Sequence, residues 1–438
     1  VKGPAAKTTS SYNPATYALK PGDFNGIAPI PKLKVEVGDQ VKAGDHIFFD
    51  KNNADIIFTA PVSGEIVAVN RGAKRAIAEI VILADSKIEY KEFNRANPVD
   101  LSREEILAQL LDSGAFAFFK QRPYNVLANP NELPKAIFIS GFDTAPLAPD
   151  YNYIMEGKGA AFQYGLDALA KLTDGKVHLN LDVKTKPCDT YNNAKNVQIN
   201  WFEGKHPAGI VGIQIHHLDP INKGDIVWTI NPLDVYNIGQ IFREGKYIPE
   251  RHVAVTGPEV KRKNYVKTLL GANVKGLVAE NLIDDSNVRA ISGNVLSGTA
   301  IEHEGYLSFY DNHITVIRNG NEPELFGWLL PGYPRPTISN TFIGPINDAP
   351  DGYHVNTNTH GEERAFVVSG QYEKVLPMDI FPVHLLKAIM ARDFELMEGL
   401  GIYELVEEDL GLCEFVCTSK IEVQDILREG LDYVREQN

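Results

Sequence analysis

Cysteine is scarce in this sequence, which contains only Cys188, Cys413 and Cys417. Three cysteines cannot build a disulfide framework, so we expect a reduced, cytoplasmic setting. No stretch approaches the roughly 18 uninterrupted apolar residues of a membrane span, which predicts a soluble or peripheral protein. Basic charge is also in short supply, because 43 Lys and Arg face 57 Asp and Glu, a net charge of −14. This balance argues against nucleic acid or anionic lipid as the main partner.

Familiar nucleotide and hydrolase motifs are missing as well. The sequence has no Walker A, G-x-S-x-G or H-E-x-x-H pattern. The loop after the first strand expected in an α/β layer, residues 142–150, contains two prolines and no glycine. A dinucleotide site needs G-x-G-x-x-G there, so that the backbone can approach the pyrophosphate at a helix N-terminus. Binding of NADH or flavin by this chain is therefore disfavoured.

Three histidines lie close enough along the chain to suggest a metal site: His206, His216 and His217. We expect residues 210–215 to form a strand, and adjacent histidines in a strand point to opposite faces. One ion could then hardly be bound by both. We favour one buried and one exposed histidine, and we assign no metal ligand and no catalytic residue.

Cys413 and Cys417 resemble the last part of an iron–sulfur run, C-x2-C-x2-C-x3-C-P. Four thiolates normally hold such a cluster. The two earlier positions are Asp409 and Leu410, and Thr418 replaces the proline. Two interpretations stay open: a buried cysteine pair on a C-terminal helix, or a half-site shared with another polypeptide of a complex.

Residues 35–69 contain Gly38-Asp39, Gly44-Asp45 and a final turn at residues 60–64, separated by short runs of β-forming residues. Turns this close together predict a small sandwich or barrel. The pattern resembles the biotinyl/lipoyl domain, whose acceptor lysine lies seven residues before the alanine of the Ala-Pro pair. That position holds Asn53, and the nearest lysine, Lys51, is misplaced. We interpret the module as a scaffold, with a lipoyl or biotin carrier as the alternative. The basic residues 71–75 that follow are most simply a solvated hairpin tip, although they could bind an anion or an acidic partner.

The remaining chain alternates strands with helices and then turns helical. Ser102 and Glu105 form a capping box for a helix over residues 101–112, which Gly114 ends. Strands at 136–141, 177–183, 197–202 and 210–215, with helices at 159–171 and 232–242, predict an α/β layer with a largely parallel sheet. After residue 251 we expect a compact α+β module with a hairpin-like pair, 306–310 and 314–317. Residues 331–361 read as a long loop, and residues 1–13 receive no element. Helices are expected at 381–400, 402–409 and 423–436, with Glu404, Glu407, Glu408 and Asp409 as a solvated face.

Many ordered blocks of this sequence together resemble the NqrA family, one of the component polypeptides of the bacterial sodium-translocating NADH:quinone oxidoreductase (Na+-NQR). They are residues 17–26 (YALKPGDFNG), 60–64 (APVSG), 71–75 (RGAKR), 204–209 (GKHPAG), 215–220 (IHHLDP), 291–298 (ISGNVLSG), 326–328 (FGW), 375–379 (VLPMD) and 407–410 (EEDL). The family is similar to the RnfC component of the Rnf complex and to the flavin-binding component of respiratory complex I. Those relatives carry cluster cysteines or a flavin loop, and this sequence lacks both. The absence of an initial Met fits a chain without its first residues.

The resemblance implies a fold of four parts. These are a biotinyl/lipoyl-like barrel-sandwich hybrid at 1–93, a Rossmann-like α/β domain at 94–250, an SLBB-type β-grasp module at 251–330, and an extended loop with a C-terminal helical part at 331–438.

It also implies a peripheral protein on the cytoplasmic face of the bacterial inner membrane, docked on the membrane component NqrB. The complex oxidises NADH, reduces ubiquinone or menaquinone and exports Na+, with NADH, flavins and iron–sulfur clusters held by other subunits. We expect this chain to hold no redox cofactor and to act as a scaffold near the quinone site. Quinone binding by the chain itself is left open, without assigned residues. The alternative is an independent quinone- or flavin-binding enzyme that works alone.

Overall fold

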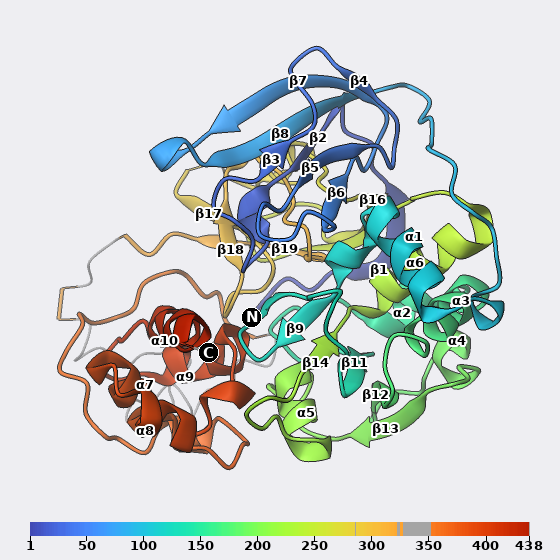
Figure 1. Ribbon diagram of the computed structural model, residues 1–438. Helices are drawn as coiled ribbons and strands as arrows, with labels where there is room; N and C mark the ends of the chain where they lie inside the picture. The colour runs from blue at the N-terminus through green and yellow to red at the C-terminus, as the bar shows by residue number, and fades with distance from the viewer. Residues whose placement is uncertain (285, 322–324, 327–351, 438) are drawn as a thin grey trace.

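The computed structural model describes residues 1–284, 286–321, 325–326 and 352–437. Within this part of the chain the fold is mixed α/β, with two six-stranded sheets, one four-stranded sheet and one three-stranded sheet (Figure 1). None of the described helices is both long and apolar enough to cross a lipid bilayer.

The N-terminal module consists of two small antiparallel sheets. One contains β2 (Thr16–Leu19), β8 (Ile77–Ala84), β7 (Gly64–Arg71) and β4 (Gln40–Val41), and the other contains β3 (Lys32–Leu33), β5 (His46–Phe49) and β6 (Ile57–Thr59). The predicted turns are confirmed: Gly38 and Gly44 have φ of 100° and 95°. Each following aspartate accepts a 2.7 Å hydrogen bond from a backbone N–H three residues earlier, as turn aspartates do.

A second sheet has the order β1 (Ala6–Ser11), β16 (Asn264–Leu269), β15 (Glu250–Thr256), β19 (His313–Arg318), β17 (Val288–Ser292) and β18 (Thr299–Ile301). The expectation of no element at residues 1–13 was wrong, because β1 pairs in parallel with β16 from far along the chain. All of β1 is exposed, so its sequence has no apolar alternation to reveal it. The predicted hairpin of 306–310 with 314–317 was also wrong, since β19 pairs with β15 and β17.

The α/β layer has the strand order β10 (Val126–Leu127), β9 (Lys120–Arg122), β14 (Val227–Thr229), β11 (Ala136–Ser140), β12 (Lys176–Asp182) and β13 (Gln198–Phe202). The last four strands in this order are mutually parallel, as predicted, and β9 is antiparallel to β14. Ile137 and Ile139 of β11 pack into the core shared with α3 (Gly159–Leu169) and α6 (Pro232–Glu244). Ala136 and Phe138 face the opposite core.

That opposite core contains α5 (Val211–Leu218), where the sequence predicted a strand at 210–215. The prediction was wrong because a short apolar run cannot separate a buried strand from a buried helix by periodicity. In the helix, the four consecutive residues Gly212 to Ile215 are all buried between the sheet and the C-terminal part.

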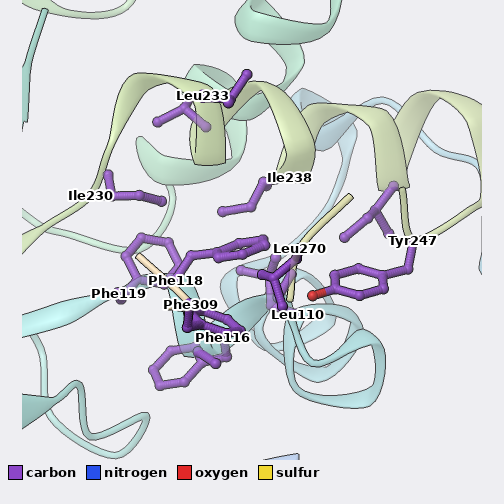
Figure 2. Close-up of a cluster of buried hydrophobic side chains, with 14 of the residues drawn as sticks. Leu110, Phe116, Phe118, Phe119, Ile230, Leu233, Ile238, Tyr247, Leu270 and Phe309 are labelled. Atoms are coloured by element: carbon purple, nitrogen blue, oxygen red, sulfur yellow. The ribbon is translucent and has the colours of Figure 1, made fainter. Parts of the chain in front are cut away.

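Helix α1 (Arg103–Ser113) confirms the predicted capping box. Ser102 Oγ accepts from the Glu105 N–H at 3.2 Å, and Glu105 Oε2 accepts from the Ser102 N–H at 2.8 Å. Gly114 ends the helix at φ 75°. A 3₁₀ turn, Ala115–Phe118, then delivers aromatic side chains into a core shared with α6 and with Phe309, as Figure 2 shows. The α/β layer and the module after residue 250 are therefore packed around common side chains.

The C-terminal part contains α7 (Pro382–Ala391), α8 (Phe394–Gly399), α9 (Gly411–Val416) and α10 (Val423–Gln437), drawn in red beside the α/β layer in Figure 1. The single helix expected at 381–400 is broken at Arg392, whose φ is 54°. The helix expected at 402–409 is two 3₁₀ turns, Ile402–Glu404 and Glu407–Leu410. Helix α10 confirms the third prediction. Of the predicted loop at 331–361, residues 331–351 lie outside the described residues, and 352–361 form no helix or strand.

Candidate functional site

A cavity of about 200 Å³ opens at the carboxyl ends of β11 and β14. Ser140 ends β11 and Thr229 ends β14, and Lys120 of β9 lies opposite Thr229 in the ladder. The strand order reverses at this point, because β12 and β13 lie on one side of β11 and β14 on the other. Open α/β sheets bind ligands at such a switch point.

The walls of the cavity come from three parts of the chain. The α/β layer contributes the loop after β11 and the start of α6. The module after residue 250 contributes Tyr310 and a turn that includes Asn294 and Ser297, and the C-terminal part contributes Glu408. The site is therefore assembled only in the complete chain.

Asp143, in the proline-containing loop, lies in the place where a dinucleotide site would present free backbone N–H groups. Its Oδ1 accepts from the Ala145 N–H at 2.8 Å. Burial raises the pKa of Asp143 to about 6, and the nearby Glu408 contributes in the same direction. A carboxylate in this position occupies a donor and repels a phosphate.

The helix starts at the cavity carry their own caps as well. Asn231 accepts from the Leu233 N–H at 3.0 Å through its side chain, and Pro232 at the first turn of α6 has no N–H. Asp150 caps α2 (Tyr151–Met155) by accepting from the Tyr153 N–H at 3.1 Å. These contacts use up donors that would otherwise hold a phosphate.

Other side chains supply donors of a different kind. Asn231 donates from Nδ2 to the Tyr151 hydroxyl at 2.6 Å. Burial raises the pKa of Tyr151 well above its ordinary value, so the phenol is neutral and keeps its O–H. The ammonium of Lys120 lies 4.1 Å from the centre of the Tyr310 ring and has no ion pair among the described residues. A cation and a phenol therefore border the cavity together.

Asp234 forms the acidic side of the cavity. It is only 1% exposed, and Oδ1 accepts from Nη1 of Arg251 at 2.6 Å, while Oδ2 has no hydrogen-bond partner among the described residues. Burial raises the pKa of Asp234 although Arg251 opposes the shift. The volume lies below the roughly 300–1,000 Å³ of pockets for drug-sized ligands. The cavity suits a small ring that bears carbonyl or hydroxyl groups.

The three histidines singled out from the sequence do not converge. His206 lies at the cavity, where its Nδ1 is 3.2 Å from Thr144 Oγ1, and burial lowers its pKa. His216 and His217 lie on α5 and not on a strand. His216 Nδ1 lies 2.7 Å from Glu404 Oε2, and His217 Nε2 lies 3.0 Å from the Pro377 carbonyl. Among the described residues no group of three or more His, Cys, Asp or Glu side chains could hold a metal ion.

The acidic run at 404–409 is not a solvated face, and this prediction was wrong. Arg122 donates to Asp409 at 2.8 Å and to Glu408 at 2.9 Å, and Arg428 donates to Glu407 at 3.0 Å. Two 3₁₀ turns replace the expected helix, so the carboxylates point in several directions and three of them meet arginines.

Cys413 lies on α9 and Cys417 directly follows it, both buried in the C-terminal core. Burial raises the pKa of Cys413 to about 12. Tyr372 donates its hydroxyl to Cys417 Sγ at 3.0 Å. In the opening module, Lys51 and Asn53 lie in the turn between β5 and β6.

Sequence reasoning had singled out the loop at 142–150 and His206, but it missed the rest of the cavity. The missed residues are Lys120, Tyr151, Asn231, Asp234 and Tyr310. One local pattern could have found two of them: an Asn-Pro pair directly after a buried apolar strand is a typical helix start at a ligand-binding edge.

The chain matches three family descriptions in sequence order. They are the NqrA N-terminal barrel-sandwich hybrid domain over residues 1–85, the NqrA second alpha/beta domain over 101–247, and the NQRA C-terminal domain over 252–303. The first and third agree with the sandwich hybrid and SLBB-type module expected from the sequence, and the second with the α/β domain.

Long relatives share one description, the A subunit of Na(+)-translocating NADH-quinone reductase. Such proteins are 40% identical to this chain in Yersinia pseudotuberculosis, 38% in Photorhabdus laumondii and 37% in Vibrio atlanticus. Each alignment spans 410 residues, 93% of this chain and 91% of the relative. A solved structure of an NAD+-reducing NiFe hydrogenase in the air-oxidized state overlaps 51% of this chain and 48% of its own, at 13% identity and a TM-score of 0.37.

Proposed function

The chain belongs to the NqrA family of the Na+-translocating NADH-quinone reductases, and on this premise we propose that it is the peripheral scaffold subunit of such a complex. Membership confirms the resemblance seen in the sequence and places the chain in the translocase class. In the proposal, the chain sits at the cytoplasmic face of the inner membrane against the membrane component NqrB. It assembles the redox subunits near the quinone site and holds no flavin, iron–sulfur cluster or NADH of its own.

The observation that carries the cofactor-free part is the contact between Asp143 and the Ala145 N–H at the carboxyl end of β11. Every nucleotide cofactor brings phosphate oxygens, which need free backbone N–H groups or cations at this edge. Here the loop fills its donor with its own carboxylate, and α6 begins with Asn231 and Pro232. A nucleotide would have to displace a buried acid and overcome its repulsion.

A direct test uses the purified chain and the reconstituted complex. We expect the chain alone to show no flavin or iron–sulfur absorption at stoichiometric level and no NADH–quinone turnover. Turnover should appear only when the other subunits are added, and it should be lost when this chain is left out. A stoichiometric cofactor spectrum would remove the cofactor-free part. Turnover by the chain alone would favour the independent enzyme.

A quinone head group in the cavity is a second candidate, favoured by one observation. Lys120 Nζ and the neutral Tyr151 hydroxyl border a hollow of about 200 Å³ next to the Tyr310 ring, so donors for carbonyl oxygens stand beside an aromatic wall. A six-membered ring with two carbonyls needs such donors and brings no phosphate.

Saturation-transfer NMR with a short-chain ubiquinone tests this candidate on the purified chain. Lys120→Met removes the donor and keeps the aliphatic stem, so we expect binding to weaken about fivefold or more. Lys171→Met, at an exposed position just after α3, is the matched control and should bind as the unchanged chain does. Absence of saturable binding, or equal binding by both variants, would exclude this cavity.

We also propose the finer division of the fold. Residues 94–250 are a Rossmann-like domain, residues 251–330 a β-grasp module and residues 331–438 a separate helical part, with the sandwich ending at residue 93. Supporting this division, the α/β sheet begins at β10 and β9 and ends at β14 before residue 250. The N-terminal strand β1 joins the sheet of the third module and ties the first part to it.

A further inference from the structure

The tip of the β7–β8 hairpin is a cationic surface in a strongly acidic chain. Between Glu65 and Glu79 the sequence has no acidic residue, whereas Arg71, Lys74 and Arg75 stand together in a chain of net charge −14. Residues 70–75 are all exposed. The hairpin end stands out from the body of the molecule at the upper left of Figure 1. A concentrated positive charge here is set apart from the acidic remainder.

None of the three cations is neutralised within the described part of the chain. Arg71, Lys74 and Arg75 form no ion pair there. The acid nearest in the ladder, Glu79, accepts instead from Nδ2 of Asn70 at 3.1 Å. The strongest local charge of the module is therefore available to another molecule.

The tip is also held in a defined shape. The Gly72 N–H donates to the Ala76 carbonyl at 2.9 Å, and the Ala76 N–H donates to the Ala73 carbonyl at 3.1 Å. Arg71 Nη1 donates to the Arg75 carbonyl at 3.2 Å. Lys74 and Arg75 both have positive φ, 53° and 65°, which costs free energy for residues with a Cβ. A pre-ordered tip loses less conformational entropy when it binds.

We propose that this tip, defined by Arg71, Lys74 and Arg75, docks on a carboxylate-rich segment of a neighbouring protein in the complex. The inference rests on the proposed function, which supplies those neighbouring proteins. Two arginines favour this partner because the planar guanidinium pairs with carboxylates through two parallel hydrogen bonds.

An anionic membrane or a nucleic acid fits the charge less well. Both are extended polyanions, and drawing one to the tip would bring the net −14 body toward the same negative surface. An acidic protein segment can be short, so it can contact the projecting tip and remain beyond the ~8 Å screening distance from the body. Local complementarity therefore selects a protein.

The test compares two triple variants of the full chain. The tip variant carries Arg71→Gln, Lys74→Gln and Arg75→Gln. The matched control carries Lys171→Gln, Lys186→Gln and Lys195→Gln, which removes the same charge from exposed, unpaired lysines of the α/β layer. A third variant, with Arg71→Lys and Arg75→Lys, keeps the charge and loses the guanidinium groups. Circular dichroism verifies that each variant is folded.

Each chain is captured on the complex through a tag on one of the other proteins, at salt concentrations from about 50 to about 500 mM. One exposed charge pair is worth a factor of about 1.5–5, so we expect the tip variant to bind about 10-fold more weakly at ~150 mM salt and with a flatter salt dependence. The control should bind like the unchanged chain, and the lysine variant should recover most of the affinity.

Three outcomes separate the ideas. Equal retention of the tip variant and the control would overturn the docking surface and leave the proposed function standing. If the unchanged chain is not retained by the other subunits at all, the proposed function fails. Protein-free vesicles of phosphatidylglycerol form the last arm: if the unchanged chain binds them and the tip variant does not, a lipid headgroup is the occupant and the protein partner is wrong.

Discussion

Nη1 of Arg122 donates to Oδ2 of Asp409 at 2.8 Å across 287 residues of sequence, and both side chains are buried. Arg122 belongs to β9, beside the cavity, and Asp409 to the 3₁₀ turn Glu407–Leu410 of the C-terminal part. The same oxygen of Asp409 accepts from the Val406 N–H at 2.8 Å. This ion pair fixes the C-terminal part against the α/β sheet, and with it the position of Glu408 in the cavity wall.

Breaking this pair should destabilise the chain strongly. Arg122→Met leaves Asp409 buried without its cation, and such changes cost about 3–5 kcal/mol. The double variant Arg122→Met/Asp409→Leu should recover most of that loss because no charge is then left unpaired. Lys184→Met is the control, since its ion pair with Glu203 is exposed and should be worth less than about 1 kcal/mol. Calorimetric melting measures all three, and equal small shifts would contradict the argument.

A glycine on α5 makes room for the pair. A Cβ at Gly212 would lie 2.3 Å from Asp409 Oδ1 and 2.4 Å from Arg122 Nη1. We expect Gly212→Ala to cost about 1–3 kcal/mol, because neither charged group can move without losing its partner. Gly399→Ala on α8 is the matched control, since nothing lies within 4 Å of its added carbon. The control should be neutral or gain up to about 1 kcal/mol. Unfolding in urea measures the difference, and two similar values would exclude the steric explanation.

The stability of the chain should depend on pH through Asp143. Its pKa in the folded chain is about 6, against 3.8 for the free group, so between these values the folded state binds more protons than the unfolded state. The free energy of unfolding therefore falls as pH rises through this window and the penalty is constant above it.

Asp143→Asn removes the charge and keeps an oxygen for the Ala145 N–H. The variant should be more stable than the unchanged chain by about 1 kcal/mol at pH 7, a figure reduced for partial exposure, and the gain should vanish below pH ~4. Asp39→Asn is the control, because this exposed carboxylate makes a similar backbone contact with Glu36. Denaturant titrations across pH measure the gain, and a gain that grows toward low pH would reverse the sign and contradict the burial.

Elements specified by neighbouring residues could be predicted from the sequence. The capping box of α1 needs only Ser102 and Glu105, three residues apart, and the turns of the sandwich need only a glycine followed by an aspartate. The core strand β11 was recognisable because five consecutive residues are apolar or small and parallel strands are buried on both faces.

Elements specified by distant residues could not. Strand β1 exists because β16 offers a free edge, and its own six exposed residues carry no pattern. Helix α5 replaced a predicted strand because its buried stretch is too short for periodicity to decide. The cavity follows the same logic: Lys120, Tyr151, Asp234 and Tyr310 belong to four elements or turns that only the strand order of the sheet brings together.

The cysteine pair at 413 and 417 allows a prediction that decides between the two interpretations of its spacing. Cys413 is 1% exposed, and its pKa of about 12 keeps nearly every thiol protonated at pH 7. Because only the thiolate attacks disulfide reagents or binds iron, we expect slow labelling by an aromatic disulfide in the native chain and labelling of all three cysteines after denaturation.

The same experiment on the assembled complex tests the shared half-site. Cys413→Ala should leave the iron content of the complex unchanged and cost only the stability of a small buried side chain, about 1–2 kcal/mol. Cys188→Ala, which removes a buried thiol far from the pair in sequence, is the matched control. Loss of iron with the first variant but not the second would mean that contact with another protein of the complex opens the C-terminal core and frees a thiolate. In that case the pair would be a ligand and not packing.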